Sequence, residues 1–175
     1  MRRHTNILIL LLLTGLCISA GAQNNPYKID DSLYPIFQRA IKWRTQPQGL
    51  LIADTLYAEA TQKKDKKAQC LALTIPVSFY LSTNNYEKLE QAATRAKEEA
   101  RKNNYLQYYY SACTNEINCL LNNGHSLRAL QKAEEMKIQA FKDQHEYGIF
   151  SCIFTLGNIY YMRQNLSLIH ISEPT

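Results

Sequence analysis

Polar side chains with hydrogen-bonding chemistry recur in this sequence at a spacing of four residues, and the set recurs forty residues later. The asparagines are the most versatile, because an amide both donates and accepts hydrogen bonds and can pair with any peptide unit. Residues four apart lie on one face of an α-helix. The pattern predicts a groove for an extended peptide, unless the stripe is polar only because it faces water. The candidate binding residues are Thr74, Ser78, Thr114, Asn118, Asn122 and Asn158.

Other residue types that carry chemistry are not arranged for it. The sequence has no glycine-rich phosphate loop, no Gly-x-Ser-x-Gly nucleophile motif and no His-Glu-x-x-His zinc motif. His125 falls in a predicted turn and His145 at a predicted helix start, so the two do not form a metal-binding cluster. We therefore expect a protein that is not an enzyme and that binds no cofactor and no metal.

The cysteines and the charges indicate no special site. Apolar neighbours favour small buried thiols, with disulfides as the alternative if the chain is exported; the cysteines concerned are Cys70, Cys113, Cys119 and Cys152. The net charge is +5, and the two basic clusters, 63–67 and 95–102, fall at predicted helix ends or turns. Cations complement the carbonyl end of a helix there. We expect no nucleic-acid partner, although a basic nucleic-acid patch is the alternative.

The elements that would position the polar stripe are helices repeated every forty residues. Two columns of alanine follow that period, and small residues are what close helix packing needs. Two apolar columns follow it as well. The four columns are Ala53, Ala93 and Ala133; Ala60, Ala100 and Ala140; Leu73, Cys113 and Ile153; and Tyr80, Leu120 and Tyr160.

The segment Leu156-Gly157-Asn158-Ile159-Tyr160 resembles the first-helix core of a tetratricopeptide repeat. In that family the glycine lets a neighbouring helix approach and the tyrosine fills the space beside it. The period of forty exceeds the usual length of about 34, and HEAT-like hairpins of about 40–47 residues are the structural alternative. The resemblance implies an all-α, right-handed α-solenoid of tetratricopeptide-like hairpins, expected near 30–69, 70–109 and 110–149, with a half-hairpin at 150–165.

The family resemblance also bears on the polar stripe. First helices line the concave groove of such solenoids, and Asn158 directly follows the glycine, as a ligand-binding asparagine does in peptide-binding members. Members that clamp acidic peptide tails use lysine and arginine in the groove. The stripe here has neither, so a carboxylate clamp is not implied. Pro76 interrupts one first helix and is expected to bend it.

The N-terminal segment 1–22 reads as a secretory signal peptide. Arg2 and Arg3 precede an apolar run, and Ala20-Gly21-Ala22 is a small-x-small cleavage site. The run is shorter than the roughly 20 residues that span a bilayer. We expect cleavage after Ala22. A lipoprotein signal at Cys17 is the alternative, disfavoured because Leu16 is not small.

The C-terminal segment 166–175 resembles a translated sequencing adapter, the mosaic end used in transposase-based libraries, over all ten residues. It is therefore excluded from the predicted repeat domain, which spans 23–165. A last helix is expected from about Glu146 to Arg163, with 166–175 disordered and the natural protein continuing beyond Asn165.

Residues 1–165 resemble the N-terminal extracytoplasmic repeat region of bacterial membrane-bound regulators with a histidine-kinase or helix-turn-helix output. The resemblance rests on the signal followed by 25–35, on 67–70 and on the repeats. It implies non-catalytic binding of a protein or peptide in the periplasm, as the sensory part of a longer regulator, with membrane attachment only through a missing downstream segment. The alternative is a stand-alone exported scaffold for envelope protein assembly.

Overall fold

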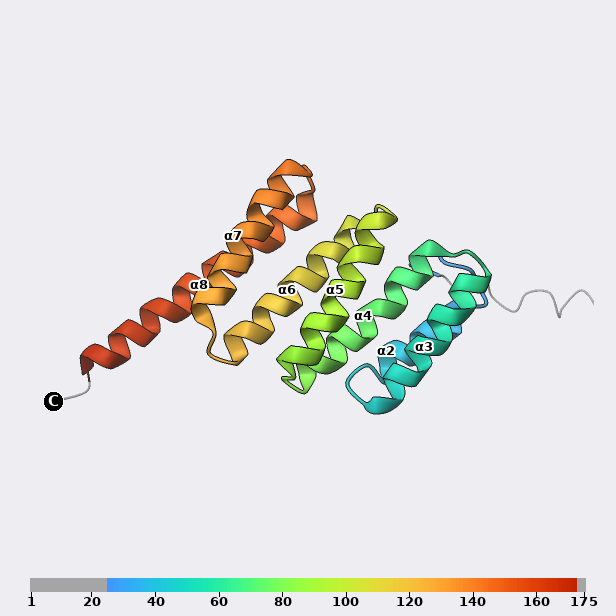
Figure 1. Cartoon of the computed structure of the whole chain (residues 1–175), viewed down its shortest axis with the longest axis horizontal. Helices are drawn as coiled ribbons and strands as arrows, with labels where there is room; N and C mark the ends of the chain where they lie inside the picture. Colours follow the sequence, from blue (N-terminus) through green and yellow to red (C-terminus); the bar gives the residue numbers. More distant parts are fainter. Residues whose placement is uncertain (1–24, 173–175) are drawn as a thin grey trace, which may run out of the picture.

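The structure is a computed structural model that describes residues 25–172, and side chains only as far as residue 162. The predicted signal peptide, with Ala20 and Ala22, lies outside these residues. The described residues form seven helices and no strand, which confirms the predicted all-α class (Figure 1). The helices are α2 (Tyr34–Lys42), α3 (Pro47–Gln62), α4 (Lys66–Ser82), α5 (Tyr86–Lys102), α6 (Leu106–Asn122), α7 (Ser126–Lys142) and α8 (Glu146–Ser172).

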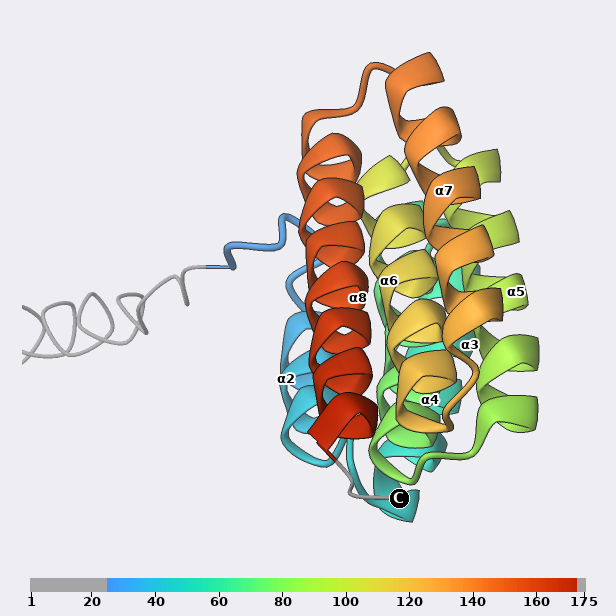
Figure 2. The ribbon, with the colours of Figure 1, turned by 90° about the vertical axis from the view of Figure 1, so that its left-hand side faces the viewer.

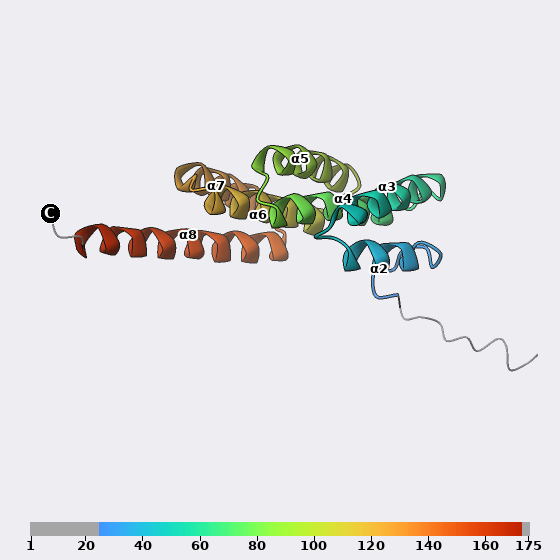
Figure 3. The same ribbon diagram turned by 90° about the horizontal axis from the view of Figure 1, so that it is seen from below.

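Alternate helices form two layers, with α2, α4, α6 and α8 in the first and α3, α5 and α7 in the second (Figure 2). The first layer is bent, and its concave side faces away from the second layer (Figure 3). Each helix packs on the next along the chain, and each first-layer helix also packs on the next first-layer helix. Within the described residues no second-layer helix packs its backbone against another. This consecutive stacking is that of an α-solenoid.

The turns from α3 onward are all alike. Each helix ends with one residue in the left-handed conformation, at φ between 50° and 77°, and these residues are twenty apart: Lys64, Asn84, Asn104, Gly124 and Gln144. The following N–H donates to a carbonyl five residues back, as from Asn85 to Tyr80 at 2.9 Å. This is the Schellman motif. The period of forty is therefore two equal helix–turn units, and the boundaries expected near 70, 110 and 150 fall inside α4, α6 and α8.

The core joins large side chains of the first layer to small ones of the second. The predicted alanine columns are all buried, at 2% exposure or less. In the largest apolar cluster, Tyr110, Ile117 and Leu120 of α6 lie with Ala133 and Ala140 of α7. Small side chains let the second-layer helix come close to the larger ones opposite, as ridge-and-groove packing requires.

One helix differs from the sequence-based expectation. α4 contains Pro76 inside one continuous helix, and the bend expected there stays a prediction. α8 does not end near Arg163 but continues to Ser172, so the backbone of 166–172 is helical and not disordered. No glycine or proline occurs between Asn158 and Pro174 to stop it. The adapter origin of 166–175 stays a prediction, which the nucleotide sequence of the gene would test.

The glycine of the predicted repeat core does not meet a neighbouring helix. A Cβ atom built on Gly157 would find nothing within 4 Å. Of the three side chains expected on its packed face, Leu156 is buried, whereas Ile153 and Tyr160 are 57% and 51% exposed. The side chains that α8 buries are those turned toward α6 and α7. The predicted close approach is therefore absent among the described residues, because no helix of this part of the chain lies on that face.

Candidate functional site

Three of the six predicted binding residues come together in the structure. Asn118 and Asn122 of α6 and Asn158 of α8 line one hollow with a volume of about 420 Å³. The hollow is completed by the apolar side chains Leu81, Leu121, Tyr161 and Met162. We refer to these seven residues as the amide hollow. It joins polar groups that can hold a peptide backbone to an apolar lining that can bury a side chain.

The three amides of the hollow are free to bind. Within the part of the chain whose side chains the structure describes, none of Asn118, Asn122 and Asn158 forms a side-chain hydrogen bond. Asn118 is half-buried, and the other two are exposed. Each amide can therefore offer donors and an acceptor to a ligand without first breaking a bond within the protein.

The hydroxyls of the predicted stripe are arranged differently. The Oγ1 atom of Thr74 donates to the Leu71 carbonyl at 2.7 Å, and Ser78 Oγ donates to the Thr74 carbonyl at 3.0 Å. Thr114 Oγ1 donates to the Tyr110 carbonyl at 3.0 Å and lies 4.0 Å from the sulfur of Met136 on α7. Such bonds to the preceding turn are usual for serine and threonine inside helices. None of the three lines the amide hollow.

Sequence reasoning missed the apolar half of the hollow, although the signal was present. Leu81, Leu121 and Tyr161 are forty residues apart, and each stands three positions after a member of the polar stripe. Residues three apart are neighbours on a helix surface. An apolar column beside a polar one is therefore the pattern that could have revealed the whole lining.

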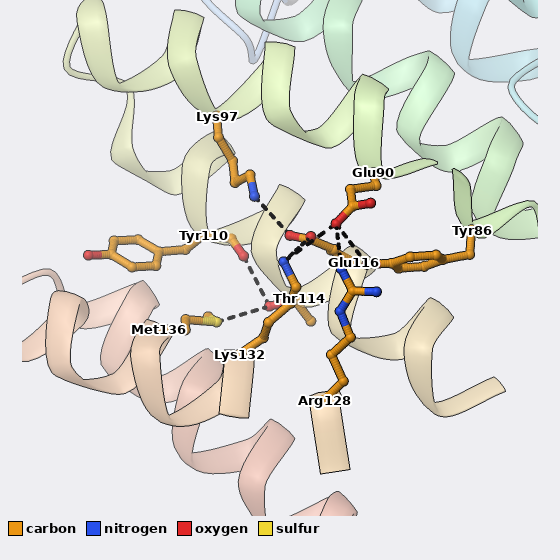
Figure 4. Close-up of polar contacts among 9 residues, drawn as sticks. All are labelled: Tyr86, Glu90, Lys97, Tyr110, Thr114, Glu116, Arg128, Lys132 and Met136. Carbon is orange, nitrogen blue, oxygen red and sulfur yellow. Dashed lines mark hydrogen bonds and ion pairs between the residues drawn. The ribbon is translucent and has the colours of Figure 1, made fainter. Parts of the chain in front are cut away.

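A second polar cluster lies between the two layers (Figure 4). Glu116 of α6 is only 3% exposed and accepts hydrogen bonds from Lys97 of α5, at 2.8 Å, and from Lys132 of α7. On the same side Glu90 of α5 accepts from Arg128 of α7 at 3.0 Å. α5 and α7 do not pack on each other. The ion pairs therefore link two second-layer helices whose backbones do not pack on each other.

The charge state of Glu116 supports a structural role. Burial on its own would raise the pKa of this carboxyl, but the hydrogen bonds from Lys132 and Lys97 outweigh it and hold the pKa below its ordinary value. The carboxylate is thus charged near neutral pH and has a cation at each oxygen. A group paired in this way is stabilised as a buried ion and has no vacant oxygen for catalysis. The sequence signal was an acidic residue where the period of forty gives Pro76 and Leu156.

The four cysteines that the structure describes are free and buried, as predicted for small apolar side chains. Burial raises the pKa of the Cys113 thiol to about 11 and that of Cys70 to about 12, so both stay protonated and unreactive. Across residues 25–172 no cluster of three or more histidine, cysteine or acidic side chains is placed to hold a metal ion. Nor does any helix in that range combine the length and apolar character needed to cross a membrane.

Comparison with known proteins gives no significant match to a protein-family model, a curated protein or a solved structure. The resemblance to tetratricopeptide repeats therefore rests on the sequence period, the alanine columns and the leucine–glycine–tyrosine core.

Proposed function

We propose that this protein is a non-catalytic binding scaffold that holds an extended peptide, or an extended segment of a protein, in the amide hollow. The observation that carries the proposal is the convergence of Asn118, Asn122 and Asn158, all without internal partners, on one apolar-lined hollow. Asparagine amides pair with backbone groups, and the apolar lining selects a side chain between them.

The lining also indicates what kind of segment would bind. No charged residue lines the hollow, so a neutral stretch with an apolar side chain fits better than an acidic tail. Each amide bond contributes a net of about 0.5–1.5 kcal/mol, and burying one Leu-sized side chain contributes roughly 1.5–3 kcal/mol. Several such contacts acting together give moderate affinity, which suits a reversible sensor or scaffold.

For the wider role, we propose that the chain is the periplasmic sensory region of a longer membrane-bound regulator. This rests on the signal-like N-terminus and on the resemblance of 1–165 to such regions. A stand-alone exported scaffold for envelope assembly is the second candidate. The full-length gene distinguishes them: a membrane helix and an output domain downstream support the first, and a stop codon soon after another repeat supports the second.

The experiment on the hollow compares peptide binding by the wild-type protein and by the double variant Asn118→Ala, Asn158→Ala. Neutral peptides selected from a library on the wild-type chain should bind the variant about tenfold more weakly or worse, since about 1.4 kcal/mol is one decade in Kd. Thermal melting should change little, because these amides have no internal partners.

The matched control is Thr74→Val with Ser78→Ala, on the same polar stripe but outside the hollow. It should leave peptide binding unchanged. Equal binding by the asparagine variant and the wild type would rule out the hollow as the binding site. A large fall in its melting temperature would show instead that the asparagines act in packing.

A further inference from the structure

α8 exposes an apolar face. The corresponding faces of the earlier first-layer helices are covered by second-layer helices. Phe150, Ile153, Gly157 and Tyr160 form the exposed face of α8, and we call these four residues the open face. The three large side chains are 68%, 57% and 51% exposed, in that order. Large apolar surfaces that lie together on a soluble protein mark sites of interaction.

The protein itself shows what covers such a face. The counterparts of the open face in α6, forty residues earlier, are Tyr110, Cys113, Ile117 and Leu120, and all four are at most 9% exposed. They pack against a column of small residues on α7, at positions i, i+4, i+7 and i+11: Ala129, Ala133, Met136 and Ala140.

The same relation holds one repeat earlier. Leu73 and Val77 of α4 share a buried cluster with Leu89, Ala93 and Ala96 of α5. In both cases large side chains of a first-layer helix meet a mostly alanine column of a second-layer helix. The open face of α8 continues this established interface by one repeat, and only its cover is absent from residues 25–172.

We propose that the open face binds an amphipathic partner helix with small residues, chiefly alanine, at positions i, i+4, i+7 and i+11, docked on α8 as α7 is docked on α6. Gly157 refines the fit. Its counterparts Ile117 and Val77 fill their interfaces, whereas Gly157 leaves open space beside Ile153. The partner therefore accommodates one larger side chain in its column, the exception that Leu89 and Met136 make in α5 and α7.

A second copy of this chain is a poorer match than a separate helix. Two α8 helices would bring large aromatic side chains against each other, unlike any hairpin in the structure. The alanine columns of α3, α5 and α7 are already buried within their own chain and are not available to a neighbour. The open face is also distinct from the amide hollow, which α8 lines with Asn158, Tyr161 and Met162.

The test uses the full chain and a fluorescent synthetic peptide of residues 122–145, which carries the α7 column. Saturable binding should appear in fluorescence anisotropy, with slower amide hydrogen exchange in 150–160. Ile153→Glu should weaken binding at least tenfold. Tyr147→Glu is the matched control on the same helix, because its counterpart Gln107 stays exposed in the complete repeat. A peptide with glutamate at 133 and 140 should not bind.

Three results would overturn the proposal. The first is no binding by the wild-type chain. The second is binding that Ile153→Glu leaves unchanged, which would mean that the peptide exchanges with α7 at its own position. The third is a dimer in sedimentation that Ile153→Glu abolishes, which would identify a second copy as the occupant. None of these depends on Asn118 or Asn158, so failure here leaves the peptide-binding proposal standing.

Discussion

α6 and α8 carry corresponding residues in the same register, yet α6 buries positions that α8 leaves exposed. Leu120 is fully buried, whereas Tyr160, its counterpart, is 51% exposed. The difference follows from neighbours: among the described residues, α6 packs on α4, α5, α7 and α8, whereas α8 packs on α6 and α7 alone. In a solenoid, a helix contributes to stability through its nearest neighbours. Corresponding residues on two helices can therefore contribute differently to the free energy of unfolding.

The comparison also explains why α8 has apolar residues on more than one side. A helix that is apolar over most of its surface is normally covered over most of its surface. α6 satisfies this rule, with seven buried residues spread between four neighbours. Among the described residues, α8 satisfies it only on the side facing α6 and α7, and its remaining apolar residues are exposed.

The largest predicted effect on stability contrasts Leu120 of α6 with its counterpart Tyr160 of α8. Leu120→Ala should lower the free energy of unfolding by about 2–5 kcal/mol, because it leaves a cavity in a closed core. Tyr160→Ala should change it by no more than about 0.5 kcal/mol, because the ring is half in water. Urea denaturation of both variants measures this. Equal losses would mean that α8 is covered in solution and that the contrast with α6 is false.

A smaller predicted effect on stability contrasts two glycines on opposite sides of α8, Gly148 and Gly157. A Cβ at Gly148 would lie 2.7 Å from the ring of Tyr110, which is fully buried and cannot shift. Gly148→Ala should therefore destabilise the protein by about 1–3 kcal/mol. Gly157→Ala should stabilise it by about 0.5–1 kcal/mol, since the methyl group meets open space and alanine favours a helix.

Thermal melts of the two glycine variants should consequently shift in opposite directions. If Gly157→Ala were destabilising, some group would have to lie against Gly157, and the open face would not be open.

The smallest effect concerns position 116, where α6 has a buried carboxylate and α8 has Leu156. Glu116→Gln should cost about 1 kcal/mol near neutral pH, because a hydrogen bond to a charged group is roughly twice as strong as a neutral one. The pKa of Glu116 is lowered in the folded state. Its contribution is therefore complete above the ordinary value of 4.5 and is lost as the pH falls through the lower folded pKa.

The measurement is urea denaturation of both proteins from pH 7 down to pH 3. The difference between wild type and Glu116→Gln should shrink below pH 4.5. The control is Glu98→Gln, an exposed glutamate that should show no such pH-dependent difference. A difference that persisted unchanged into acid would mean that the variant acts through packing and not through charge.

Much of the fold could be predicted because the signals are local. Helix α3 begins at Pro47, a residue suited to the first turn of a helix, and the alanine columns are buried as their period indicated. The end of α8 could not be predicted in this way, because a helix continues until something breaks it. The role of Gly157 depended on a neighbour that the described residues do not supply.

The candidate site was predictable only in part. The period of forty placed Asn118 and Asn158 on neighbouring helices, and the structure brings them to one hollow. The period could not show that Thr74 and Ser78 use their hydroxyls on their own helix, because that choice depends on rotamers. Glu116 was missed since its partners come from two other helices, nineteen and sixteen residues away in sequence.

The identical turns have a consequence for how the chain avoids misfolding. Because every loop from α3 onward has the same backbone, the loops cannot distinguish odd-numbered from even-numbered helices. Threading the chain one helix out of phase would exchange the layers and bury the charged outer side of α5, with Glu87, Lys88 and Glu98, between neighbours. Unpaired buried charges are costly. The alternation of the charged helices α5 and α7 with the more apolar α4 and α6 thus selects against out-of-phase stacking. The side chains, and not the loops, specify the layer of each helix.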